Sequence, residues 1–228
     1  MKLVVFGASG KCGRELVKLA TARGHAVTAV VRAETEVALP AGVVLLRGDV
    51  LDEAFVSHAV GGADAVASAL GMRYAHPWAR RMSPDDFISR ATSHVVAAMQ
   101  AHGVKRLVVI SAAGVGDSRP MLNLPMRALL ATSNVGVAYA DLERVERLLD
   151  GSGLDWQAVR PVTLSNRAAT GRIARVRRYG AMASIARADV AAYMLESLEA
   201  PRLQERTPMI SETRTPRESL DRSSPART

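Results

Sequence analysis

Three glycines near the N-terminus constrain the fold of this chain more than any other feature of the sequence. Gly7, Gly10 and Gly13 follow directly on the apolar run 2–6, and apolar residues then recur at helical spacing through 11–23. This order predicts a strand buried on both faces, a tight turn and a helix. A glycine loop between a strand and a helix brings backbone N–H groups close to a pyrophosphate. The loop therefore predicts a dinucleotide-binding site.

The three glycines have separate expected roles. Gly7 permits the tight turn, Gly10 lets the backbone approach the pyrophosphate, and Gly13 lets the helix pack closely on the strand. Cys12 has two interpretations: a small residue beside the pyrophosphate, or a thiol whose pKa the helix N-terminus lowers. The loop residues expected to contact the cofactor are Gly7, Ser9, Gly10, Lys11, Cys12 and Gly13.

The end of the second predicted strand indicates which dinucleotide binds. An NAD site places Asp or Glu about 20 residues after the loop to hold the ribose 2′-hydroxyl, whereas this chain has Arg32. A guanidinium there attracts a 2′-phosphate, and Lys11 adds a second positive charge. Glu34 lies nearby and partly restores the NAD pattern. The sequence favours NADP(H) over NAD(H); the alternative is that Arg32 is a solvated strand end.

Strands and helices continue to alternate along the chain. Parallel strands joined through helices form a doubly wound sheet, which predicts one α/β domain over 1–211. Ser83 is the expected N-cap of one helix. Residues 212–228 are rich in Thr, Pro, Arg and Ser, so we expect a disordered tail. Further strands are predicted at 26–31, 43–47, 64–69, 105–110, 154–159 and 208–211, and helices at 52–60, 83–102, 139–150 and 188–199.

In a sheet of this kind the ligand lies across the carboxyl ends of the strands. We expect Asp49 to accept from the adenine amino group or, alternatively, to serve a turn or cap. Gly71 allows close approach of the adenosine ribose or is a simple loop glycine. Ser111 bonds the nicotinamide amide or the substrate, or else caps a turn. The positions expected to line the site at the strand ends are Asp49, Val50, Leu70, Gly71, Ser111, Pro161 and Thr163.

Two long connections follow strand ends near the expected nicotinamide. The segment 72–83 mixes aromatic and cationic residues, and it is either a substrate lid or a surface loop. The segment 112–138 carries large apolar residues that form either a wall for a planar substrate or a helix packed on the core. These residues are Met121, Leu122, Leu124, Met126, Leu129 and Leu130.

The formal net charge is +8, and many of the arginines gather late in the chain. Seven arginines and no carboxylate fall between 160 and 188. This run has three interpretations: a solvated face, a site for an anionic substrate or cofactor, or a nucleic-acid site. We do not expect nucleic acid, because zinc-finger spacing and aromatic RNA-binding signatures are absent. The seven are Arg160, Arg167, Arg172, Arg175, Arg177, Arg178 and Arg187.

Cysteine content and hydropathy indicate the compartment. The single cysteine, Cys12, excludes an internal disulfide and fits a reducing environment. No run approaches the roughly 20 apolar residues of a membrane span, and the run at 2–6 is too short for a signal-peptide core. We expect a cytoplasmic protein without a metal site, and a small molecule as its substrate.

Several short segments together resemble the atypical short-chain dehydrogenase/reductase superfamily, in particular the NAD(P)H-binding branch related to NmrA and to biliverdin reductase B, a flavin reductase. The resemblance covers nearly all of 1–211. It implies a Rossmann-type domain, NADP(H) as the cofactor, and hydride transfer to flavins, quinones or similar conjugated acceptors. The segments that carry it are 5–13, 30–32, 48–50, 70–73, 83–84, 96–104, 152–161 and 185–191.

The sequence departs from this superfamily at the catalytic dyad. The usual Tyr-x-x-x-Lys pair needs a lysine four residues after a tyrosine, but Tyr139 is followed at that spacing by Glu143. The chain contains no lysine after Lys105. Related proteins often carry Lys or His at the position of Leu142, and the biliverdin reductase B branch has a histidine at the position of Thr163.

A missing general acid does not prevent reduction of flavins or quinones, because these compounds can take a proton from water after the hydride arrives. The first hypothesis is therefore an NADPH-dependent oxidoreductase acting on a planar conjugated acceptor, with Ser111 and Thr163 flanking the nicotinamide. The second is a non-catalytic NADP(H)-sensing regulator of the NmrA-like kind. Epimerase-like or isomerase-like chemistry is a third, against which the missing dyad argues.

Overall fold

The computed structural model describes residues 1–178 and 183–213. The first part of the chain alternates strands and helices in the order β1 (Lys2–Phe6), α1 (Lys11–Ala22), β2 (Ala26–Val31), β3 (Val44–Arg47), α2 (Glu53–Val60), β4 (Ala65–Ser68), α3 (Phe87–Ala101) and β5 (Arg106–Ile110). The remainder contains η1 (Gly116–Met121), α4 (Leu124–Thr132), α5 (Asn134–Asp150), β6 (Asp155–Pro161), β7 (Thr163–Ser165), β8 (Ile173–Arg175), β9 (Ser184–Ala186), α6 (Arg187–Glu199) and β10 (Met209–Glu212).

One large sheet organises these elements, in the strand order β3-β2-β1-β4-β5-β6-β10-β8. All neighbouring strands are parallel except β8, which runs antiparallel to β10. From β1 the chain adds β2 and β3 on one side, and it then returns to add β4, β5 and β6 on the other side. Doubly wound sheets bind ligands at this switch point between β1 and β4. The predicted Rossmann-type fold is therefore confirmed, with an antiparallel edge strand that the sequence analysis did not predict.

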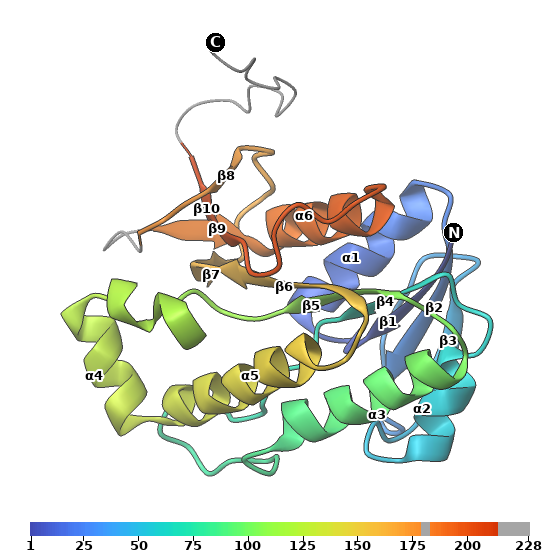
Figure 1. Ribbon diagram of the computed structural model, residues 1–228, viewed down its shortest axis with the longest axis horizontal. Coiled ribbons are helices and arrows are strands. Elements are labelled where there is room, and N and C mark those ends of the chain that lie inside the picture. The colour runs from blue at the N-terminus through green and yellow to red at the C-terminus, as the bar shows by residue number, and fades with distance from the viewer. Residues whose placement is uncertain (179–182, 214–228) are drawn as a thin grey trace.

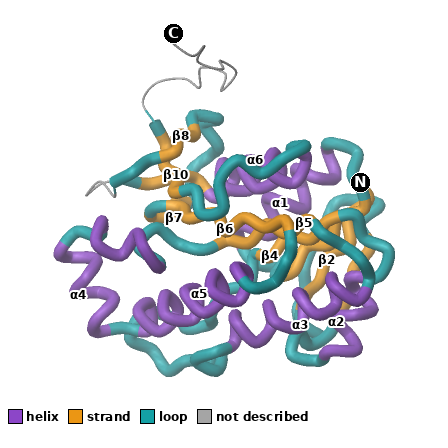
Figure 2. The backbone as a smooth tube through the Cα atoms, in the orientation of Figure 1, coloured by secondary structure: helices purple, strands orange, loops and turns teal. Residues whose placement is uncertain are grey.

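Helices cover both faces of this sheet. Helices α1 and α6 lie on one face, and α2, α3 and α5 lie on the other (Figures 1 and 2). Alternate residues of β1 enter opposite cores, because successive strand side chains point to opposite faces. Leu3 and Val5 pack in the α1/α6 core, whereas Val4 and Phe6 pack in the α2/α3/α5 core. Burial on both faces explains why residues 3–6 form an uninterrupted apolar run, whereas Lys2 is exposed.

The helix predicted over 83–102 begins four residues later in the structure. Helix α3 begins at Phe87, and the Ser83 hydroxyl accepts from the backbone N–H of Arg73 instead of capping the helix. The cap comes from another helix: the buried Asp141 carboxylate of α5 accepts from the N–H of Ile88 at 2.7 Å and from the Ser89 hydroxyl at 2.5 Å. The residue that caps α3, Asp141, is thus distant in sequence, and Ser83, the cap predicted from the local sequence, is not used.

The region after β5 also differs from expectation. Helix α5 begins at Asn134 rather than 139, with the Ser133 hydroxyl accepting from Val135 N–H, and α4 occupies much of the preceding segment. The pair β7–β9, which forms a separate two-stranded parallel sheet, was not predicted. Glu212, assigned to the tail from sequence, is the last residue of β10. The rest of the predicted tail, 214–228, lies outside the described residues.

Candidate functional site

The glycine loop joins β1 to α1 with very little space for side chains. Gly7 has φ +74°, and a Cβ there would lie 2.6 Å from the carbonyl oxygen of Ala69. A Cβ on Gly13 would lie 2.2 Å from the carbonyl oxygen of Gly7, so α1 packs directly on the loop. At Gly10 a Cβ would lie 3.2 Å from the Gly7 oxygen, which is tight but not impossible. Two of the glycines are thus required by the protein itself.

The N-terminus of α1 has the properties of an anion site. Gly10 is the N-cap and offers no side chain to the first turn, and that turn contains no acidic residue. The first N–H groups of a helix have no intrahelical acceptor, and they carry partial positive charge. An anionic group such as a pyrophosphate fits these donors. The residues present therefore fit the phosphates of a dinucleotide.

Cys12 lies in this first turn and is buried. Burial raises the pKa of its thiol from 9.0 to about 11, although the nearby positive charge of Arg187 acts in the opposite direction. The interpretation of a thiol with a lowered pKa is thus wrong, because desolvation of the thiolate outweighs the helix terminus. Cys12 is a small buried residue.

A cavity of about 220 Å³ opens beside the loop, and we call it the adenosine cavity. Arg32, directly after β2, lines it, and its contact with a 2′-phosphate stays a prediction. Arg73 and Phe87 line it as well, and neither was predicted. The full lining consists of Gly7, Ser9, Gly10, Val30, Val31, Arg32, Val50, Ala69, Leu70, Gly71, Arg73 and Phe87.

Six of the thirteen predicted cofactor residues do not line this cavity: Lys11, Cys12, Gly13, Asp49, Ser111 and Pro161. Lys11 does not line the adenosine cavity; it faces a different cavity between α1 and α6. Asp49 is exposed, and its carboxylate accepts from the N–H of Leu51 at 2.9 Å, which is the turn role that the sequence left as the alternative. Asp52, not Asp49, caps α2. The second cation beside Arg32 is therefore Arg73, which the 72–83 segment contributes.

Ser111, directly after β5, belongs to a buried charge network. Its hydroxyl donates to the Glu146 carboxylate at 2.6 Å, and Arg160 donates to the same carboxylate through Nε at 2.9 Å and through a terminal nitrogen at 2.5 Å. The other terminal nitrogen of Arg160 binds Asp117 at 2.5 Å. Burial alone would lower the pKa of Arg160, but the hydrogen bonds and charges of Glu146 and Asp117 outweigh it and raise that pKa.

Three further positions from the sequence analysis are Tyr139, which lacks its dyad lysine, the predicted catalytic residue Thr163 and the predicted cofactor residue Pro161. The Tyr139 hydroxyl donates to the carbonyl oxygen of Ala113 at 3.2 Å. Thr163 is the exposed first residue of β7, and Pro161 is the buried last residue of β6. Helix α5 presents Glu146, two turns after Tyr139, to the end of β5. Glu146 was not predicted from the sequence, because only its contacts with Ser111 and Arg160, which lie 35 and 14 residues away, distinguish it.

A further cavity, of about 600 Å³, lies in the segment after β5, and we call it the η1–α4 cavity. Leu122 and Leu130 are the members of the predicted apolar wall that line it, whereas Leu124 is 78% exposed. Asp117 lines the cavity and also pairs with Arg160, so the cavity reaches the charge network of Ser111. The lining residues are Gly116, Asp117, Arg119, Pro120, Leu122, Arg127, Leu130 and Ala131.

The 72–83 segment is fixed to the start of α5. Asn134 donates its backbone N–H to the carbonyl of Pro77 at 2.8 Å and its side-chain amide to the carbonyl of Ala79 at 2.5 Å. Arg81 donates to the Asn134 side chain at 2.9 Å. Trp78 remains 64% exposed. The segment contributes Arg73 to the adenosine cavity from this anchored position.

Carboxylates from other parts of the chain meet several of the late arginines. Arg160 is buried with Glu146, and Glu212 pairs with both Arg167 and Arg172. A single solvated face therefore does not describe this run. Among residues 1–178 and 183–213, the structure contains no group of three or more potential metal ligands. No helix in the same ranges has the length and hydropathy needed to cross a membrane.

Comparison with known proteins agrees with this geometry. A family model described as NAD(P)H-binding matches residues 7–201. The 2-alkyl-3-oxoalkanoate reductase of Stenotrophomonas maltophilia (strain K279a) is 38% identical over 111 residues. That match covers 49% of this chain and 33% of the relative, so it spans about a third of the length of that protein.

Two solved structures cover nearly the whole chain. The anaerobillin reductase ChuY of Escherichia coli O157:H7 is 27% identical, with a TM-score of 0.75, and the match covers 96% of this chain and 100% of that one. A putative NAD-dependent epimerase/dehydratase from Bacillus halodurans is 25% identical, with a TM-score of 0.76, and the match covers 95% and 96% of the two chains.

Proposed function

The chain belongs to the NAD(P)H-binding family, and from this premise we propose that it is an NADPH-dependent reductase that transfers hydride to a planar conjugated acceptor such as a flavin or a quinone. The named reductases among its relatives and structural neighbours support oxidoreductase chemistry. When bound, NADPH supplies the hydride, and the protein supplies binding, orientation and electrostatics.

The adenosine cavity supports NADPH as the cofactor. Arg32 and Arg73 both line it, and its described lining includes no carboxylate, since Glu34 is not among those residues. A guanidinium binds a phosphate through charge-assisted hydrogen bonds, whereas the ribose hydroxyls of NADH offer it no charge. The first turn of α1 would hold the pyrophosphate, and these two arginines would hold the 2′-phosphate.

The choice of a flavin or quinone as acceptor rests on two hydroxyl groups whose protons are already used in hydrogen bonds within the protein. Ser111 donates its proton to Glu146, and Tyr139 donates to the carbonyl of Ala113. The lysine that the usual dyad places four residues after the tyrosine is Glu143 here, and the chain has no lysine after Lys105. Reduction of a simple ketone needs a positioned acid, whereas a flavin or quinone can take its proton from water. The apolar residues of the η1–α4 cavity suit a planar ring system.

The test is NADPH oxidation across a panel of flavins and quinones, with Tyr139→Phe beside the wild type. Loss of a general acid lowers the rate by roughly 10²–10⁴. Because we propose that water and not Tyr139 supplies the proton, we expect Tyr139→Phe to remain within about threefold of wild type. Tyr193→Phe is the matched control, because that hydroxyl lies on α6 and accepts from Arg175. A loss of about a hundredfold in Tyr139→Phe alone would contradict water as the proton source.

The same panel separates the reductase from the regulator. A protein that binds NADPH tightly but oxidises it with no acceptor of the panel would contradict the proposal. That result, together with a change in partner binding on adding NADP(H), would support the NADP(H)-sensing alternative.

A further inference from the structure

A cavity of about 550 Å³ lies between α1, the chain after β7 and the first residues of α6, and we call it the basic cavity. Its lining shares no residue with the adenosine cavity, although Lys11 directly follows Gly10 in the chain. The volume falls in the range of small-molecule sites. The lining residues are Lys11, Arg14, Glu15, Lys18, Asn166, Arg167, Ala168, Ala169, Arg187 and Ala188.

The charge of this lining is strongly positive. Five of its side chains are cationic and one, Glu15, is anionic, and Glu15 lies 3.3 Å from Lys18. Within the described parts of the chain, Lys11, Arg14 and Arg187 have no carboxylate partner. Three positive charges from two helices therefore face one cavity without compensation, which raises the local concentration of anions.

Arg187 is oriented by a neutral group. One of its terminal nitrogens donates to the side-chain oxygen of Asn166 at 2.6 Å. An amide oxygen fixes the direction of the guanidinium but leaves its full charge for another ligand, unlike the carboxylates that hold Arg160. An arginine that is positioned without being neutralised is preorganised to bind an anion.

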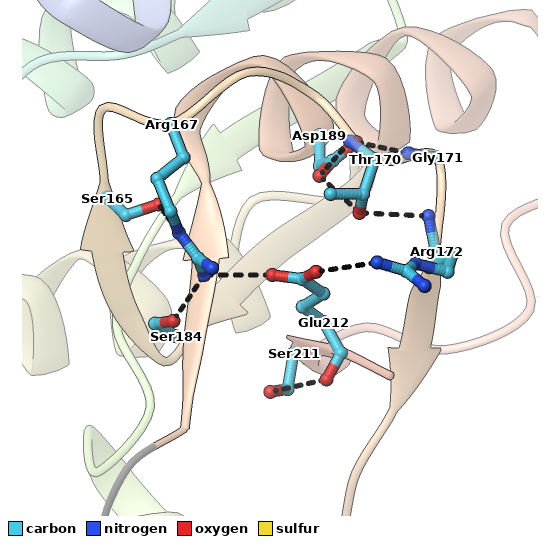
Figure 3. A network of polar contacts seen from close by, with 9 residues as sticks. All are labelled: Ser165, Arg167, Thr170, Gly171, Arg172, Ser184, Asp189, Ser211 and Glu212. Carbon is cyan, nitrogen blue, oxygen red and sulfur yellow. Dashed lines mark hydrogen bonds and ion pairs between the residues drawn. The ribbon is translucent and has the colours of Figure 1, made fainter. Parts of the chain in front are cut away.

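The far wall of the basic cavity is also fixed in place. The buried carboxylate of Asp189 accepts from the N–H groups of Thr170 and Gly171 at 3.0 and 2.9 Å, which anchors the chain after β7 to α6 (Figure 3). Figure 3 also shows the Glu212 carboxylate between Arg167 and Arg172. Arg167 thus shares one carboxylate with Arg172, and the cations of the lining that have no carboxylate partner among the described residues come from α1 and Arg187.

We propose that the basic cavity is a second anion site, separate from the cofactor site, for a small ligand that carries two or more adjacent phosphate or carboxylate groups. Lys11, Arg14 and Arg187 come from two helices around a cavity of about 550 Å³, which suits a ligand with more than one anionic group. An extended nucleic acid is less suited, because the charges line a cavity rather than a continuous surface track. The proposal does not depend on reductase activity.

The position of Lys11 predicts weak coupling to the cofactor. Its N–H belongs to the first turn of α1, whereas its side chain faces the basic cavity. Anions on the two sides of this residue repel one another, so a bound dinucleotide should weaken the second ligand by about two- to fivefold without displacing it. The coupling must be reciprocal.

The experiment is calorimetric titration of the full chain with inorganic tripolyphosphate, citrate and orthophosphate, each with and without saturating NADPH. We expect saturable one-to-one binding of tripolyphosphate or citrate that persists at saturating NADPH, and orthophosphate at least tenfold weaker. The comparison of tripolyphosphate with citrate identifies whether phosphate or carboxylate groups suit the site. Binding of neither, or complete displacement by NADPH, would overturn the proposal.

Matched variants test the residues. Hydrogen bonds to charged groups predict that Arg187→Gln and Arg14→Gln each weaken the better ligand by about tenfold. Arg147→Gln is the control, an exposed helical arginine on α5 that removes the same charge far from the cavity; it should stay within about twofold. Arg14 is exposed on α1, so its loss cannot be attributed to unfolding. Equal loss in all three variants would mean nonspecific attraction and would refute the site.

Discussion

The two sides of the candidate site are built from different kinds of contact. In the glycine-loop side (residues 7–32), backbone meets backbone: Gly13 packs on the Gly7 carbonyl, and Gly7 packs on Ala69. In the charge-network side (residues 111–189), side chains distant in sequence hold the chain, as in Ser111–Glu146–Arg160 and in Asp189 with Thr170. The first side has no space for a side chain at Gly7 or Gly13, whereas the second depends on buried charges keeping their partners.

Gly13→Ala should have the largest effect, because its new Cβ would lie 2.2 Å from the Gly7 carbonyl oxygen and the loop would have to move. We expect NADPH affinity to fall more than about a hundredfold, with a loss of about 1–3 kcal/mol in the free energy of unfolding. Fluorescence titration and urea denaturation measure the two. Gly151→Ala is the control, since its nearest atom would be 3.9 Å away. NADPH affinity within threefold of wild type in Gly13→Ala would contradict the conclusion that the loop has no space for a side chain at this position.

Glu146→Gln tests the opposite side. It leaves the buried Arg160 without its main counter-charge, which should cost about 3–5 kcal/mol in the free energy of unfolding. NADPH affinity of the folded protein should stay within about threefold. Asp155→Asn provides contrast, because its pair with Arg106 is partly exposed and should contribute less than about 1 kcal/mol. A fall in NADPH affinity that matched the loss of stability would show that the charge-network side also determines cofactor binding.

Cys12 predicts a pH dependence that belongs to the glycine-loop side alone. Burial raises the pKa of its thiol from 9.0 to about 11, so the folded state disfavours the thiolate. The associated stability is complete below pH 9 and is lost as the pH rises to 11, by about 2–3 kcal/mol. Unfolding measured over this range should show that decline in the wild type beyond the decline in Cys12→Ala. Parallel curves for the two proteins would count against it.

Arg32→Ala and Arg73→Ala should give the smallest effects, and they sharpen how the cofactor is chosen. We expect NADPH to bind Arg32→Ala about 10–100-fold more weakly, and Arg73→Ala only a few-fold more weakly, with NADH little changed in either. Arg47→Ala, an exposed arginine at the end of β3 that does not line the adenosine cavity, is the control. Equal wild-type affinity for NADPH and NADH would refute a 2′-phosphate contact.

The difference between the two sides also explains what the sequence could predict. The order β1, glycine loop, α1, β2 and Arg32 could be read directly, because each element is defined by neighbours in the chain. Ser111 could be placed at a strand end, but its partner Glu146 could not, because nothing local distinguishes Glu146 from Glu143, the other glutamate of α5. Strands β7, β8 and β9 have three residues each, too few to show an alternating pattern. Lys11 was predicted to add a positive charge beside Arg32, but it is the first residue of α1 and its side chain lines a different cavity, which the local sequence does not show.

The cap of α3 links the local unfolding of two helices. The carboxylate of Asp141, on α5, holds the N–H of Ile88 and the hydroxyl of Ser89 in the first turn of α3. Helix α3 therefore cannot complete its own N-terminus, and undocking of α5 releases both helices as one cooperative unit. In amide hydrogen exchange, Ile88 would then share the protection of the α5 core rather than fray like an ordinary helix end. Its exchange rate would report the docking of a helix more than fifty residues away in sequence.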